Sequence, residues 1–253
     1  MEYIARKKGY DVLITGVLKS NSCKEWIMRR NVDGVIFLGI YHEMFFKEVK
    51  MLNIPVVLID TYEKIASDFF NIGIDDVYGG YIATKHLLDL GHRNIVLVIG
   101  SDSSKVHIKR LEGYKKALKE YGVEFNKNLV FETNKVSFDG GLNLGKNIFK
   151  ALPNVTAVFA SADVLAVGLI KAFKECNKNV PEDISIVGFD DIDLCKYFNP
   201  PITTVRQDIF EKGINASKAI INEIEKKHLT KNRNIVLDLS LVVRGSTQSP
   251  KRL

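Results

Sequence analysis

Short apolar runs alternate along this chain with longer amphipathic stretches, and this alternation constrains the fold more than any other feature. The runs are rich in Val and Ile and nearly continuous: Asp11–Thr15, Gly34–Leu38, Val56–Ile59 and Ile95–Ile99. Strands buried on both faces of a parallel sheet have this composition, because helices cover both sides of such a sheet. We expect these four runs to form parallel strands.

The amphipathic stretches between the runs predict helices. Tyr78–Leu90 is followed by Gly91, a residue suited to a helix C-terminal cap. A second series of expected helices and strands follows at Lys109–Tyr121, Leu129–Glu132, Gly140–Leu152, Ala157–Ala160, Val164–Cys176, Ser185–Gly188, Ile209–Lys226 and Ile235–Val243. Such alternation predicts a doubly wound α/β architecture. The number of strands favours two parallel sheets, packed as two lobes.

Charge and composition narrow the class of protein. The formal net charge is +6, but the basic residues are scattered, as on a solvated surface rather than in a nucleic-acid groove. The three Cys and five His show no metal-ligand spacing. We therefore expect neither a metal nor a cofactor. The sequence shows no secretory segment and no bilayer-spanning segment, so the cytoplasm is the expected location.

A series of motifs runs through the chain in a fixed order. It comprises VDGVIF (Val32–Phe37), IPVVLID (Ile54–Asp60), GGYIATKHLLDLGHRNI (Gly79–Ile95), RLEGYKKAL (Arg110–Leu118), TAVFASADVLAVG (Thr156–Gly168), VPEDISIVGFDD (Val180–Asp191), ITTVRQDIFEKGINA (Ile202–Ala216) and LVVRGST (Leu241–Thr247). From about Gly9 to Thr247, this series resembles the ligand-binding core of the lactose-repressor/galactose-repressor (LacI/GalR) family of transcription regulators.

The resemblance implies two lobes of the kind found in periplasmic sugar-binding proteins, joined by three chain crossings. These are expected near Gly100–Ser101, near Val205–Asp208 and near Asp238–Leu239. The N-terminal lobe would comprise residues 1–100 and 208–238, and the C-terminal lobe residues 101–207 and 239–253. A small-molecule effector would bind between the lobes, at the C-terminal ends of the strands.

The resemblance also bears on partners. Family members carry an N-terminal helix-turn-helix and a first core strand, and neither is found in this sequence. Operator DNA is therefore expected as a partner only through that missing N-terminal domain. A homodimer is expected, and the apolar stretch Tyr41–Leu52 is a candidate for part of its interface. The effector class is a sugar, a sugar phosphate or a purine.

Two residues are the first candidates for effector contact. Asp190 ends the apolar strand ISIVGF, where a carboxylate can accept hydrogen bonds from sugar hydroxyls. Capping of the next turn is the alternative for Asp190, and it is the preferred role for Asp191. Arg110 is expected to open a helix, and the family's R-x-x-G-Y pattern implies that it contacts ligand. A surface ion pair is the alternative for Arg110.

Four more residues complete the candidate site. Asp163 is foremost an N-cap, with ligand contact as a second possibility. Phe138 is either a ring stacked on the ligand or a core residue. Gln207, with the neighbouring Asp208, lies at the expected second crossing. For Asp75, a cleft role and a helix cap are equally favoured.

The function that these observations predict is the sensing of a small polar metabolite by a LacI/GalR-type repressor. The alternative is a sugar-binding receptor of a transport system, which has the same fold but requires export. Enzymatic activity is not expected, because no strand enters a GxGxxG turn, a GxSxG elbow or a phosphate-binding loop. The sequence does not specify the effector.

Overall fold

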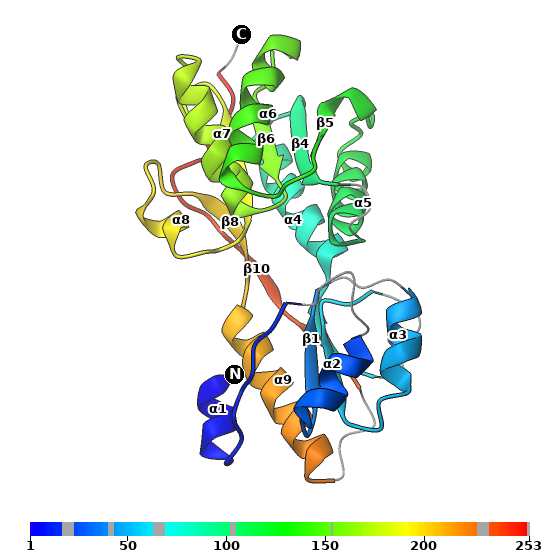
Figure 1. Cartoon of the computed structure of the whole chain (residues 1–253). Helices are drawn as coiled ribbons and strands as arrows, with labels where there is room; N and C mark the ends of the chain where they lie inside the picture. The colour runs from blue at the N-terminus through cyan, green and yellow to red at the C-terminus, as the bar shows by residue number, and fades with distance from the viewer. Residues whose placement is uncertain are drawn as a thin grey trace. The chain divides into compact units, whose positions relative to one another are not determined.

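Two separate parallel sheets organise the computed structural model of the chain (Figure 1). The structure describes residues 1–16, 23–39, 43–62, 69–101, 105–152, 154–226 and 233–251. Unit 1 comprises Met1–Ile74 and Asp208–Leu237, and unit 2 comprises Asp75–Gln207 and Asp238–Leu253. The expected α/β class, with one sheet in each of two units, is confirmed.

Unit 1 is built on a four-stranded, all-parallel sheet in the order β1-β2-β3-β9. Its strands are β1 (Val35–Leu38), β2 (Val56–Ile59), β3 (Phe70–Ile74) and β9 (Asn234–Leu237). Its helices are α1 (Glu2–Lys7), α2 (Cys23–Arg30), α3 (Glu43–Lys50) and α9 (Ile209–Ile224). All four residues of β2 are buried, as its continuous apolar run predicts.

One expectation for unit 1 is wrong. Residues 11–16 form no strand and are exposed, with Ile14 at 89%. A strand requires hydrogen-bonding neighbours, and no described strand pairs with this run. The stretch Tyr41–Leu52 stays a prediction as part of a homodimer interface, and its first two residues lie outside the described residues. Its residues Phe46, Val49 and Leu52 belong to the core of unit 1, packed with Ile27 and Leu58.

Unit 2 is built on a six-stranded sheet in the order β10-β8-β7-β6-β4-β5, in which only β10 is antiparallel to its neighbour. Its strands are β4 (Ile95–Gly100), β5 (Val130–Thr133), β6 (Ala157–Ala160), β7 (Ser185–Asp190), β8 (Thr203–Gln207) and β10 (Leu239–Val242). Its helices are α4 (Asp76–Asp89), α5 (Lys105–Glu120), the short 3₁₀ helix η2 (Lys127–Leu129), α6 (Phe138–Ala151), α7 (Asp163–Glu175) and α8 (Leu194–Tyr197).

The first division between the units lies at Ile74–Asp75, not near Gly100 as expected. The strand Ile95–Gly100 pairs with β5 and β6 and is therefore part of the second sheet. The later divisions lie at Gln207–Asp208 and Leu237–Asp238. The expected single strand Ile235–Val243 is consequently two strands, β9 and β10, which belong to different sheets.

Glycine allows α4 and α5 to pack closely in unit 2. A Cβ on Gly113 would overlap the backbone carbonyl oxygen of Val77, and one on Gly80 would overlap the carbonyl oxygen of Arg110. The next residue, Tyr114, is buried and donates its hydroxyl proton to the Ile95 carbonyl oxygen at 2.9 Å. The R-x-x-G-Y motif thus fixes the position of α5 against α4 and against β4.

Two further motifs meet at the C-terminal segment of the chain. His92, of the GHR turn, is buried and binds Thr156 through Nδ1 at 3.0 Å and the Gln248 carbonyl oxygen through Nε2 at 2.9 Å. Ser246 donates to the Ile186 carbonyl oxygen at 2.6 Å and accepts a hydrogen bond from the Thr203 backbone N–H at 2.8 Å. These hydrogen bonds hold the C-terminal segment of unit 2 against its sheet. Within the described residues, no helix is long and apolar enough to cross a bilayer.

Candidate functional site

The C-terminal edge of the unit 2 sheet gathers polar side chains from several strands. In a parallel sheet the carboxyl ends of the strands meet at one edge, where doubly wound folds bind ligands. β7 ends at Asp190 and β8 at Gln207, while Ser161 directly follows β6. All six residues predicted for the site belong to unit 2.

Asp190 has a strained backbone at this edge. Its φ is +116°, in a region that favours glycine, and the following Asp191 also has a positive φ. The Gln207 side-chain amide donates a hydrogen bond to Asp190 Oδ1 at 2.6 Å. Strain of this kind persists only where the surrounding structure holds it, and it concentrates at functional sites. The structure thus brings two of the predicted residues into direct contact.

Arg110 lies in the second turn of α5, not at its start, and is only 5% exposed. Its Nε donates to Asp76 Oδ1 at 2.7 Å, and its Nη1 donates to the Ser161 carbonyl oxygen. The guanidinium carbon lies 3.4 Å from the centre of the Phe189 ring. The alternative of a surface ion pair is therefore wrong, because this ion pair is buried.

The expected capping roles of Asp163 and Asp191 are both wrong. Asp163 is fully buried, and its side chain makes no cap hydrogen bond at the start of α7. Its Oδ1 instead accepts from the Thr204 hydroxyl at 2.6 Å, and its Oδ2 from the Ile192 backbone N–H at 2.9 Å. Burial raises the pKa of Asp163 more than these hydrogen bonds lower it. The carboxylate thus links α7 to β8 and to the chain after β7.

Asp191 forms ion pairs with two arginines of unit 2. Arg206 Nε and Arg244 Nη2 each lie 2.6 Å from one of its carboxylate oxygens. Burial of Asp191 acts to raise its pKa, but the two guanidinium groups outweigh burial and leave the pKa lowered. Its carboxylate therefore helps hold the strand end that carries Asp190.

The last two predicted residues begin helices. Asp75 is the N-cap of α4, and its Oδ1 accepts from the Tyr78 backbone N–H at 2.9 Å, so the capping alternative is confirmed. Phe138 is the first residue of α6 and is 41% exposed, which makes it no core residue.

Comparisons with known proteins place the chain in a family. Residues 84–247 match the family described as Periplasmic binding protein-like domain. The ribose operon repressor of Haemophilus influenzae is 30% identical over 257 residues, covering 99% of this chain and 76% of the repressor. This chain belongs to the LacI family of transcriptional regulators.

Other LacI-family proteins agree with this assignment. The HTH-type transcriptional regulator DegA of Bacillus subtilis is 37% identical over 87% of this chain, which spans 66% of the DegA length. A LacI family regulator from Enterococcus faecium, solved with bound ribose, superposes with a TM-score of 0.87 at 29% identity, covering 99% of this chain and 92% of that one. A dimeric Lac repressor superposes with a TM-score of 0.86 at 25% identity, covering 98% of this chain and 92% of that one.

This LacI-family chain has a buried histidine beside Arg110 that the sequence analysis missed. His107 Nδ1 lies 3.0 Å from the Ser161 hydroxyl oxygen. Burial and the Arg110 charge lower the pKa of His107 to about 4, against the opposite effect of Asp76. The available signal was spacing, because His107 precedes Arg110 by three residues and so lies on the same face of α5.

A second missed cluster lies at the C-terminal edge of the unit 1 sheet. Asp60 follows β2 with a φ of +55°, and Lys212 Nζ of α9 lies 2.6 Å from its Oδ1 and 2.8 Å from its Oδ2. The Thr61 hydroxyl donates to the carbonyl oxygen of Gly39, directly after β1, at 3.3 Å. The signal that identified Asp190, a carboxylate directly after a buried strand, also applies to Asp60.

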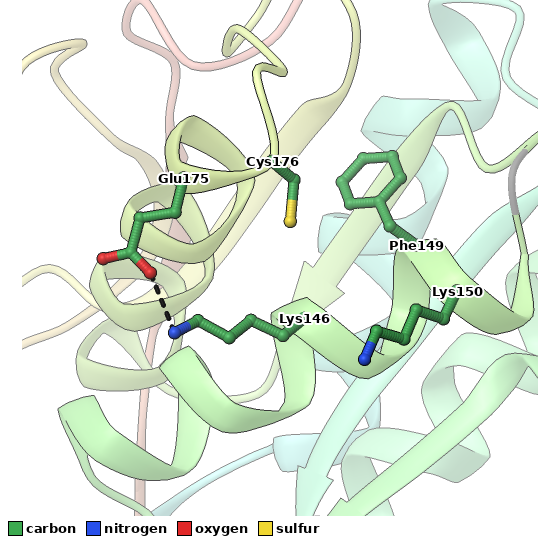
Figure 2. A pocket seen from close by; sticks show the side chains of 5 residues that line it. All are labelled: Lys146, Phe149, Lys150, Glu175 and Cys176. Atoms are coloured by element: carbon green, nitrogen blue, oxygen red, sulfur yellow. Dashed lines mark ion pairs between the residues drawn. The ribbon is translucent and has the colours of Figure 1, made fainter.

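A groove also lies between α6 and α7 of unit 2, with a volume of about 400 Å³ (Figure 2). None of the six predicted site residues lines it. Its lining comes from the C-terminal parts of the two helices, whereas Phe138 and Asp163 mark their N-terminal ends.

Proposed function

We propose that this chain is the effector-sensing part of a LacI-family repressor, that it binds a small sugar or similar polyhydroxylated metabolite, and that it catalyses no reaction. The observation that carries the proposal is the strained Asp190 at the C-terminal end of β7, with its carboxylate held by Gln207. A strained carboxylate at the ligand-binding edge of a parallel sheet is held in position for a function beyond the fold.

The chemistry of this edge suits hydroxyl groups. Each hydroxyl both donates and accepts hydrogen bonds, so a sugar ring needs acceptors and donors together. Asp190 supplies acceptors, while the Gln207 amide and the Arg110 guanidinium supply donors. The solved relative with bound ribose and the ribose operon repressor support a sugar as the effector.

Operator binding is the second part of the proposed function. DegA is named as an HTH-type regulator, and this chain spans 66% of its length. We propose that operator DNA is bound by a helix-turn-helix domain and that these 253 residues alone bind no specific operator. The dimeric Lac repressor supports a homodimer, which matches a near-palindromic operator.

Titration calorimetry with D-ribose, extended to other sugars, sugar phosphates and purines, tests the proposal. The matched variants are Asp190→Asn and Asp183→Asn, because Asp183 lies just before the opposite end of the same strand. A charged hydrogen bond contributes about 1.5–3 kcal/mol, so Asp190→Asn should weaken binding ~10- to 150-fold. Asp183→Asn should leave the affinity unchanged.

Thermal unfolding gives the second measurement. A ligand at ~100 times its dissociation constant stabilises the folded state by about 2.7 kcal/mol. If no compound of these three classes stabilises the chain, the proposed function is wrong. If a sugar binds equally well to wild type and to Asp190→Asn, the site has been misplaced.

A further inference from the structure

The groove between α6 and α7 is lined by five residues: Lys146, Phe149, Lys150, Glu175 and Cys176 (Figure 2). Its volume of about 400 Å³ falls within the range of small-molecule sites, roughly 300–1,000 Å³. It lies near the C-terminal ends of the two helices, away from the polar edge described above. The groove is therefore a site distinct from the proposed effector site.

One part of the groove is apolar. The Phe149 ring is partly exposed, and its position is fixed by an edge-to-face contact with the buried Phe173, with ring centres 4.8 Å apart. The exposed thiol of Cys176 lies on the α7 side of the groove (Figure 2). A fixed aromatic ring beside a polarisable sulfur favours a flat apolar partner, because both make favourable contacts with rings.

The other part of the groove carries excess positive charge. Lys146 pairs with Glu175 at 2.9 Å, and Glu175 also lies 3.6 Å from Lys171. No described carboxylate forms an ion pair with Lys150. Lys178 adds a further positive charge, with its amine 5.8 Å from the centre of the Phe149 ring. One carboxylate thus faces several amines.

We propose that this groove binds a small aromatic anion, such as an aromatic carboxylate, with its ring against Phe149 and Cys176 and its charge at Lys150. Lysines near helix C-terminal ends also offset the helix dipole, a role that requires no ligand. The experiment separates the two, because a binding groove makes the preference of Cys176 for an aromatic anion depend on Lys150 and lets a competing aromatic anion protect the thiol.

The test uses Cys176 as a reporter. In a Cys23→Ser background, the thiolate of Cys176 attacks the sulfur–sulfur bond of 5,5′-dithiobis(2-nitrobenzoate), an aromatic dicarboxylate, and the thionitrobenzoate anion leaves. The same thiol is reacted with the neutral reagent 4,4′-dithiodipyridine. The ratio of the two rate constants reports the preference for the anion and largely cancels the reactivity of the thiol itself. Cys195 is fully buried, which shields it from both reagents.

Lys150→Gln should lower this ratio ~2- to 5-fold, since one exposed ion pair contributes up to about 1 kcal/mol. Lys119→Gln, an exposed lysine on α5, makes the same change in net charge and should leave the ratio unchanged. Millimolar 2-naphthoate should slow both reagents with the Cys23→Ser protein. The proposal would be overturned if the ratio of the two rate constants were equal in Lys150→Gln and Lys119→Gln, because general attraction to a basic protein would then explain the preference for the anionic reagent. It would also be overturned if 2-naphthoate gave Cys176 no protection.

Discussion

Replacing Arg110 with Met tests whether the buried ion pair holds unit 2 together. Arg110 and Asp76 lie 2.7 Å apart, with side chains only 6% and 1% exposed. Removing the guanidinium leaves the Asp76 carboxylate buried without the compensating charge of Arg110. Breaking a buried pair in this way costs about 3–5 kcal/mol, because the remaining charge keeps its desolvation penalty. For a chain of this size, the melting temperature should fall by about 6–20 °C.

A double-mutant cycle separates the charge from packing. Asp76→Asn removes the stranded charge, so Arg110→Met combined with Asp76→Asn should recover part of the loss. The control is Lys85→Met. Lys85 and Asp89 are 2.8 Å apart, but their side chains are 36% and 50% exposed. Breaking this exposed pair should cost no more than about 1 kcal/mol.

The assay is urea unfolding followed by far-ultraviolet circular dichroism, with the midpoint and slope compared among the four variants and wild type. A loss for Arg110→Met no larger than that for Lys85→Met would refute the argument. Such a result would mean that, in the wild-type protein, the contact with the Phe189 ring holds Arg110 in place and the charge of Asp76 contributes little. Any loss of effector affinity in Arg110→Met must be interpreted beside this measurement, because the residue stabilises the fold that presents the site.

Three other results are expected. Gly113→Ala should destabilise the protein by about 1–3 kcal/mol, because the added methyl group overlaps the Val77 carbonyl oxygen, whereas Gly16→Ala, with open space around it, should be neutral in the same urea assay. Because the pKa of His107 is lowered to about 4, unfolded chains take up a proton below about pH 6.5 that folded chains do not. Stability should therefore fall by up to about 3 kcal/mol as pH decreases from about 6.5 to about 4, and His107→Gln should flatten this part of the urea-midpoint profile. Sedimentation equilibrium at micromolar concentration should give a dimer, and a pure monomer would contradict the proposed assembly.

Strands were predictable where local composition decides burial. The runs that became β2 and β4 are continuous in Val, Leu and Ile, and every residue of both strands is buried. Residues 11–16 have a similar composition but form no strand, because a strand depends on neighbours that its own sequence does not specify. The first division between units was misplaced for the same reason. An apolar run such as Ile95–Ile99 fits either sheet, and only pairing with β5 and β6 assigns it to unit 2.

In the candidate site too, roles that depend on neighbouring residues could be predicted, and roles that depend on residues far away in the sequence could not. Asp190 could be found because a carboxylate directly after a buried strand is a local signal. An aspartate at the start of a helix usually caps it, yet the partners of Asp163 are Thr204 and Ile192, about 30–40 residues further along the chain. Likewise, the partner of Arg110 lies 34 residues earlier. Roles that depend on such distant partners could not be derived from local spacing.

The pairing of β3 with β9 has a consequence for synthesis on the ribosome. Asn71 and its partner Asn234 are separated by 163 residues, and the whole of β4 to β8 is made between them. At roughly 5–20 residues per second, β3 is exposed for about 8–30 s before β9 has been made. By the end of that interval all strands of unit 2 except β10 have been made, while the unit 1 sheet still has an open edge at β3. We therefore expect the unit 1 sheet to be completed only after most of unit 2 has been synthesised.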